Sequence, residues 1–168
     1  TRALAAFQRT LISGNSPYDQ YNYQNQDTAL SEAEIRGLEL FFSDELACNS
    51  CHEGFNFTNQ TFMNNGTKLD YSSDLGRYRV TLDSYAIGKF SVPTLRLIAH
   101  TAPYMHDGSF PDLEQVIAHY NEGGLGNAQQ DERIRPLGLS AQQQADLKAF
   151  LVTLTDETFI ANPVFGPN

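Results

Sequence analysis

The stretch Cys48-Asn49-Ser50-Cys51-His52 decides how the rest of the sequence is interpreted. Its two cysteines are the only ones among 168 residues, so a disulfide framework does not hold the chain together. A chain of this length is the size of one ordinary domain and buries a core without such cross-links. The thiols and the adjacent imidazole therefore point to cofactor, metal or redox chemistry.

The Cys-x-x-Cys-His spacing is typical of covalent haem attachment. Both thiols reach the vinyl groups of one haem and form thioethers, and the histidine presents its imidazole to the iron. We therefore expect one covalent haem c on Cys48 and Cys51, with His52 as the proximal iron ligand. A thiol–disulfide centre would need a βαβ setting, of which the sequence gives no sign. A zinc site would need two further ligands from the remaining histidines, which are His100, His106 and His119.

Two helices are expected to cross near the motif. Ser31 and Glu34 form a capping box that opens a helix leading into it, and Ser140 with Gln143 opens a second helix near the C-terminus. Gly37 lies inside the first helix, where a glycine costs about 1 kcal/mol relative to alanine. That cost is tolerable where another backbone comes close, so we expect the crossing at Gly37. Two such helices outline a class I cytochrome c domain.

The remaining segments carry weaker signals. We expect a short helix over residues 2–12, an irregular connector over 18–27, and mostly loop over 53–92 with an extended piece near 78–82. Further helices are expected to begin within 92–96 and at Pro111, the second ending at Gly123-Gly124, and Pro163 and Pro167 mark a terminal tail.

Together these signals predict the fold class and the domain organisation. The fold is all-α, a class I cytochrome c-like domain with covalently bound haem, long loops and an N-terminal helical extension. Residues 1–27 are an interdomain-type helix and connector, and residues 28–168 are the cytochrome c domain with its C-terminal tail.

The charge balance excludes several classes of partner. Lys and Arg number 11 against 20 Asp and Glu, a net charge of -9, which argues against nucleic-acid binding and against a polybasic membrane anchor. No apolar run reaches the roughly 18 residues of a membrane-spanning helix.

The chain begins at Thr1 without an export signal, which we interpret as a processed or partial chain.

Several stretches resemble the C-terminal half of bacterial dihaem cytochrome c peroxidases and MauG proteins. They are residues 90–96 (FSVPTLR), 101–110 (TAPYMHDGSF), 113–116 (LEQV) and 119–121 (HYN). Residues 5–17 resemble the family's segment between its two haem domains, and residues 136–154 resemble its end. The resemblance covers nearly the whole chain.

The resemblance implies a function and a set of partners. The C-terminal haem of the family passes electrons to an N-terminal haem that reacts with hydrogen peroxide. A second haem domain or chain, a small electron-donor protein and a periplasmic or otherwise exported location are therefore expected. This half alone would only transfer electrons. The chain also departs from the family in having no tryptophan, a residue that the family commonly places between the haems. The alternative is a stand-alone monohaem electron carrier, or a structural cytochrome subunit without peroxidase activity.

The resemblance also implies site residues, none of them certainly catalytic. The family's second iron ligand lies fourteen positions after the histidine of its His-Asp-Gly motif, which here places Tyr120 opposite His52, with Met105 as the alternative. Arg96 is expected to pair with a haem propionate. The backbone carbonyls of Thr101 and Pro103 match positions that bind calcium between the family's two domains.

Overall fold

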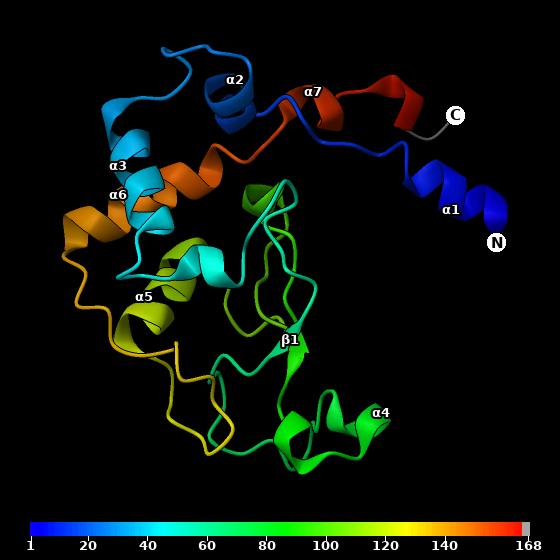
Figure 1. The fold of residues 1–168 in the computed structure, drawn as a ribbon, viewed down its shortest axis with the longest axis vertical. Coiled ribbons are helices and arrows are strands. Elements are labelled where there is room, and N and C mark those ends of the chain that lie inside the picture. The colour runs from blue at the N-terminus through cyan, green and yellow to red at the C-terminus, as the bar shows by residue number, and fades with distance from the viewer. Residues whose placement is uncertain (166–168) are drawn as a thin grey trace.

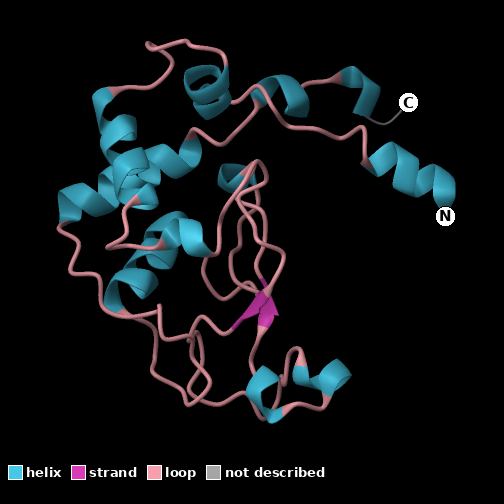
Figure 2. Ribbon diagram, in the orientation of Figure 1, coloured by secondary structure: helices cyan, strands magenta, loops and turns pink. Residues whose placement is uncertain are grey.

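The computed structural model describes residues 1–165 and shows a mainly helical chain (Figures 1 and 2). The last three residues of the expected tail, Pro167 among them, lie outside the described part. The α-helices are α1 (Arg2–Gln8), α2 (Pro17–Tyr23), α3 (Glu32–Phe42), α4 (Tyr78–Thr81), α5 (Leu113–Glu122), α6 (Ala141–Val152) and α7 (Glu157–Ile160). The 3-10 turns are η1 (Cys48–Ser50), η2 (Ser84–Ala86), η3 (Ile98–His100) and η4 (Pro163–Phe165).

Both predicted capping boxes are confirmed. The Ser31 backbone N–H donates to the Glu34 carboxylate at 2.6 Å, and Ser140 and Gln143 make the same reciprocal pair at the start of α6. The helix from residue 111 onward is α5, which Asp112 caps and which ends at Gly123 with a φ of 86°. Local chemistry therefore defines the ends of the helices that surround the motif.

Four expectations for the weaker segments are wrong in detail. The first helix stops at Gln8 rather than residue 12, and part of the expected irregular connector is α2. A third capping box, Ser16 with Asp19, and Pro17 at the first helical position start α2, which its polar composition had obscured. Residues 78–81 are helical, not extended. No helix begins within 92–96, since the following turn is only η3.

The crossing of α3 and α6 lies at Gly37, as predicted (Figure 1). A Cβ there would lie 1.9 Å from the Asp146 carbonyl oxygen and 2.8 Å from the Phe150 Cβ. Arg36 joins the two helices beside this crossing, because its guanidinium donates two hydrogen bonds to the Asp146 carboxylate, at 2.9 and 3.0 Å. Phe150 is fully buried at the centre of one hydrophobic core. The other buried members of this core are Tyr18, Phe41, Leu46, Phe57, Leu95, Ile98, Leu113, Ile117, Leu139, Leu147, Leu151 and Leu154.

A two-stranded ribbon organises the segment between α3 and α5. Strands β1 (Phe62–Met63) and β2 (Phe90–Ser91) pair antiparallel, with Phe62 opposite Ser91 and Met63 opposite Phe90. The ribbon was not expected, and it brings the loop after the motif beside the segment that leads to η3. The fold is thus helical with one small sheet.

The N-terminal segment divides into an exposed and a packed part. Helix α1 buries none of its residues, whereas α2 places Tyr18 in the core. Within residues 1–165, no helix combines the length and the apolar character needed to cross a bilayer. The boundary expected at residues 27 and 28 stays a prediction.

Asp19 and Arg96 form a buried ion pair that ties α2 to the segment before η3. The guanidinium donates to both carboxylate oxygens, at 2.8 and 2.9 Å, and the two side chains are 1% and 5% exposed. Nε of Arg96 also donates to the Phe55 carbonyl at 2.8 Å, and the guanidinium lies over the Phe55 ring. The pair therefore fixes residues 55–57, immediately after the motif.

Replacing Gly37 by alanine is expected to lower the free energy of unfolding by about 1–3 kcal/mol. The new methyl group pushes the α6 backbone away, and the gain in helix propensity, about 1 kcal/mol, does not offset that. Denaturant unfolding followed by circular dichroism measures the change. Gly14→Ala is the matched control, because its Cβ would lie 3.4 Å from the nearest atom, on the Phe55 ring. Equal losses in the two variants would contradict the close crossing.

Replacing Asp19 by asparagine is expected to cost about 3–5 kcal/mol, because it leaves the Arg96 charge buried without a partner. The double variant Asp19→Leu with Arg96→Met should recover most of that loss. Thermal unfolding of the single and double variants measures both effects. Glu114→Gln, which breaks the exposed pair with Lys148, is the control and should cost under about 1 kcal/mol. A loss for Asp19→Asn no larger than the control's would disprove the pair's role.

Candidate haem site

The motif begins in the tight turn η1, directly after α3 and the short segment of residues 43–47. The His52 N–H donates to the Cys48 carbonyl at 3.0 Å, so the two thiols and the imidazole project from one compact turn. Both cysteines are free and half-buried. Burial raises the pKa of the Cys48 thiol to about 11. Burial of this kind disfavours the reactive thiolate form of Cys48.

The His52 ring is oriented by the backbone. Nδ1 lies 3.0 Å from the Phe57 carbonyl oxygen, and because a carbonyl only accepts, Nδ1 carries the proton. Nε2 then holds the lone pair that binds a metal. Burial lowers the pKa of His52 and favours the neutral imidazole. The ring is therefore in the tautomer that an iron ligand requires.

Two further donor atoms converge on the side chain of Asn65. Its Nδ2 lies 3.3 Å from the Tyr120 hydroxyl oxygen and 3.2 Å from the Met105 sulfur. Tyr120 lies on α5, and Met105 lies in the turn of residues 104–108, at a positive φ of 70°. The pKa of Tyr120 is raised, first by burial and then by the nearby Cys48 and Cys51 thiols. The Tyr120 hydroxyl thus lies near the two thiols of the motif.

This donor set fits haem c. It contains two free thiols, a neutral imidazole with Nε2 available, a phenol oxygen and a thioether sulfur, all on half-buried side chains. Within residues 1–165, no group of three or more His, Cys, Asp or Glu side chains gathers in a way that could hold a metal ion. The other three histidines have protein partners of their own. His119 donates to the Asn65 carbonyl at 2.8 Å, His100 lies 3.4 Å from Glu157, and His106 stacks on Phe90 at 3.6 Å.

Arg96 lies close to the motif but is engaged with protein groups. Three of its five N–H donors go to Asp19 and the Phe55 carbonyl. Arg96 therefore contacts the segment of residues 55–57, whose Phe57 carbonyl accepts the hydrogen bond from His52. Its expected pairing with a haem propionate stays a prediction, and the contacts it makes are structural.

The segment expected to bind calcium is exposed. Thr101, Ala102 and Pro103 are exposed, and the peptide bond between Ala102 and Pro103 is cis. Two contacts hold the adjoining turn: His106 Nε2 lies 3.2 Å from the Asp74 carboxylate, and Asp107 forms an ion pair with Lys68 at 2.9 Å. Calcium binding by the Thr101 and Pro103 carbonyls stays a prediction.

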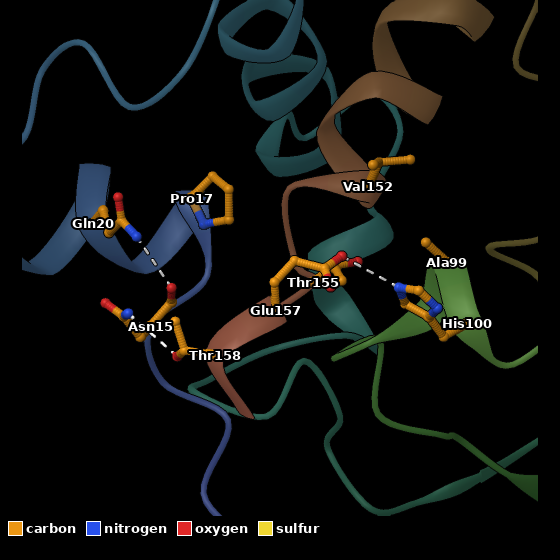
Figure 3. Close-up of a pocket in the computed structure, with 9 residues that line it drawn as sticks. All are labelled: Asn15, Pro17, Gln20, Ala99, His100, Val152, Thr155, Glu157 and Thr158. Carbon is orange, nitrogen blue, oxygen red and sulfur yellow. Dashed lines mark hydrogen bonds and ion pairs between the residues drawn. The ribbon is translucent and has the colours of Figure 1, made fainter. Parts of the chain in front are cut away.

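A pocket of about 320 Å³ opens between α2, η3 and α7, away from the motif (Figure 3). Its lining includes Asn15, His100, Thr155 and Glu157, and it contains none of the candidate haem residues. The pocket is therefore a separate feature of the surface beside the segment of Thr101.

Sequence reasoning missed three residues that shape the site. Phe57 orients His52, Asp19 holds Arg96, and Asn65 contacts both alternative second ligands. The capping box at Ser16 and Asp19 was a readable signal for α2, whereas the contacts of Phe57 and Asn65 depend on the folded loops. No motif in the sequence points to them.

Comparisons with known proteins place the chain in a family. No family model matches it. It is 38% identical over 162 residues to the methylamine utilization protein MauG of Methylorubrum extorquens, and 32% identical over 186 residues to the cytochrome-c peroxidase IdrP1 of Pseudomonas sp. strain SCT. These matches cover 94% and 92% of the chain, but 44% and 48% of the two relatives.

Solved structures agree with these matches. A MauG-like protein associated with microbial copper homeostasis superposes with a TM-score of 0.90 at 38% identity, over 98% of the chain and 55% of that protein. The diheme peroxidase BthA of Burkholderia thailandensis shares the fold, with a TM-score of 0.64 at 22% identity over 86% of the chain and 47% of that protein. The chain spans about half the length of the curated relatives it matches, and it belongs to the family of MauG proteins and bacterial cytochrome c peroxidases.

Proposed function

We propose that this chain is the haem c electron-transfer domain of a dihaem cytochrome c peroxidase or MauG-like protein. The observation that carries the proposal is the His52 imidazole, held in its ligand tautomer beside two free thiols. The half-length match to MauG and to cytochrome-c peroxidases supports the C-terminal half of such a protein.

The residues of the motif hold the cofactor in this proposal. Cys48 and Cys51 form the two thioether bonds, each by adding its S–H across one vinyl group. His52 binds the iron through Nε2, while the Phe57 carbonyl keeps the ring in position. When bound, haem c supplies a centre that gains and loses one electron at a time.

Tyr120 is the second iron ligand in this proposal, with Met105 as the alternative. Tyr120 lies on the α5 helix, and its hydroxyl lies near the two thiols and 3.3 Å from the Asn65 Nδ2. A phenolate oxygen is a harder, anionic donor than a thioether, so it stabilises ferric iron and lowers the reduction potential. Met105 in the same position would raise that potential.

The electrons that peroxide reduction needs imply two partners, a donor protein and a second haem domain. Reduction of H₂O₂ to two waters takes two electrons and two protons, so a donor protein delivers one electron twice per turnover. This chain passes those electrons to a second haem domain, where peroxide reacts. Covalent haem of this type is consistent with a periplasmic or otherwise exported protein. A calcium ion held by the carbonyls of Thr101 and Pro103 would lie at the junction of the two domains.

The function is tested in the complete, haem-loaded protein. Hydrogen peroxide consumption with a reduced cytochrome as donor is expected to fall to background when Cys48 and Cys51 are both replaced by alanine. The absorption spectrum of the second haem should remain unchanged in that variant. Detection of one haem and no peroxide consumption in the parent protein would instead establish the stand-alone electron carrier.

The second ligand is tested by Tyr120→Phe, which removes only the hydroxyl group. We expect loss of the phenolate-to-iron charge-transfer absorption and a rise in reduction potential. The rise corresponds to a tenfold or larger change in the reduction equilibrium, about 59 mV for one electron. Met105→Leu is the comparison variant and should keep the charge-transfer band, because it leaves the Tyr120 hydroxyl in place. A parent protein without the charge-transfer band, together with a fall in reduction potential in Met105→Leu, would identify Met105 as the ligand.

A further inference from the structure

Among residues 1–165, Asn65 is the side chain that hydrogen-bonds to both candidate second ligands. Its Nδ2 lies 3.3 Å from the Tyr120 oxygen and 3.2 Å from the Met105 sulfur. A thioether sulfur only accepts hydrogen bonds, so the contact with Met105 orients the amide with its nitrogen toward this pair. The amide nitrogen carries two hydrogens, and both contacts form at once.

The backbone around Asn65 is anchored on both sides. On one side, Asn64 is fully buried and exchanges side-chain amide bonds with Asn127, at 3.0 and 3.1 Å. On the other side, Gly66 has a φ of 72°, and its carbonyl accepts from Leu125 at 2.9 Å. The Gln130 side chain packs over Gly66, where an added Cβ would lie 2.0 Å from its Oε1.

Helix α5 supplies a third anchor. His119 Nε2 donates to the Asn65 carbonyl at 2.8 Å, and His119 is itself buried. Because His119 and Tyr120 are neighbours on α5, the same helix turn holds the backbone of Asn65 and receives its side chain. The amide is thus pre-positioned relative to the Tyr120 oxygen.

We propose that Asn65 is a positioning residue that donates a hydrogen bond to the Tyr120 oxygen and thereby sets the reduction potential of the haem. The inference rests on the proposed function, in which Tyr120 binds the iron. A hydrogen bond to a phenolate withdraws electron density from the oxygen and weakens its donation to ferric iron. Asn65 therefore moderates the low potential that an anionic ligand imposes.

The test is the reduction potential of Asn65→Leu, which removes the donor at similar size, in the complete haem-loaded protein. We expect a fall corresponding to a tenfold change in the reduction equilibrium, about 59 mV for one electron. The phenolate-to-iron charge-transfer band should move to lower energy. Asn22→Leu makes the same substitution at an exposed position of α2 and should change neither property.

A measurement on the unaltered protein covers the case in which Asn65→Leu does not fold. Resonance Raman spectra are recorded in H₂O and in D₂O, and the phenolate C–O vibration is expected to shift on exchange of the amide hydrogens. No shift in D₂O, or an unchanged potential and band in folded Asn65→Leu, overturns the proposal for Asn65 alone. Absence of the phenolate band in the parent protein overturns Tyr120 ligation and the Asn65 proposal with it.

Discussion

At Gly37 the backbones of α3 and α6 touch, and a single added carbon would lie 1.9 Å from the Asp146 carbonyl oxygen. The bidentate pair of Arg36 with Asp146 holds the helices at that separation. Helix α3 leads within a few residues to Cys48, and α6 also packs against α5, which carries Tyr120. The motif and its candidate second ligand are therefore placed relative to each other through this one crossing.

A second set of contacts joins the N-terminal segment to the motif. Asp19 of α2 holds Arg96, Arg96 holds the Phe55 carbonyl, and two residues later the Phe57 carbonyl orients His52. An imidazole that binds iron needs its other nitrogen fixed in this way, since the hydrogen bond sets both tautomer and ring orientation. The ion pair is buried, so its contribution lies in specifying the loop geometry as much as in stability.

Features encoded by neighbouring residues were predictable from the sequence, and features that need the folded loops were not. Three signals lie in residues that are close together in the sequence: the Cys48–His52 spacing, the two capping boxes, and the glycine at position 37. The structure confirms the capping boxes and the helix crossing at Gly37. The short α4 and the two-residue strands β1 and β2 have too few residues for a periodic pattern to indicate them. Asp19 and Arg96 are 77 positions apart, and Asn65 and Tyr120 are 55 apart, so only the fold brings each pair together. The family resemblance is what points to Tyr120, and its role as an iron ligand stays a prediction.

The proposed function depends on Cys48, Cys51 and His52 holding a covalent haem within a two-haem protein. The intact mass of the natively purified protein, taken under denaturing conditions together with its haem content, tests it most directly. We expect a polypeptide that keeps haem after denaturation, with one haem on this motif and a second elsewhere in the same protein. A polypeptide mass without any attached haem would contradict it.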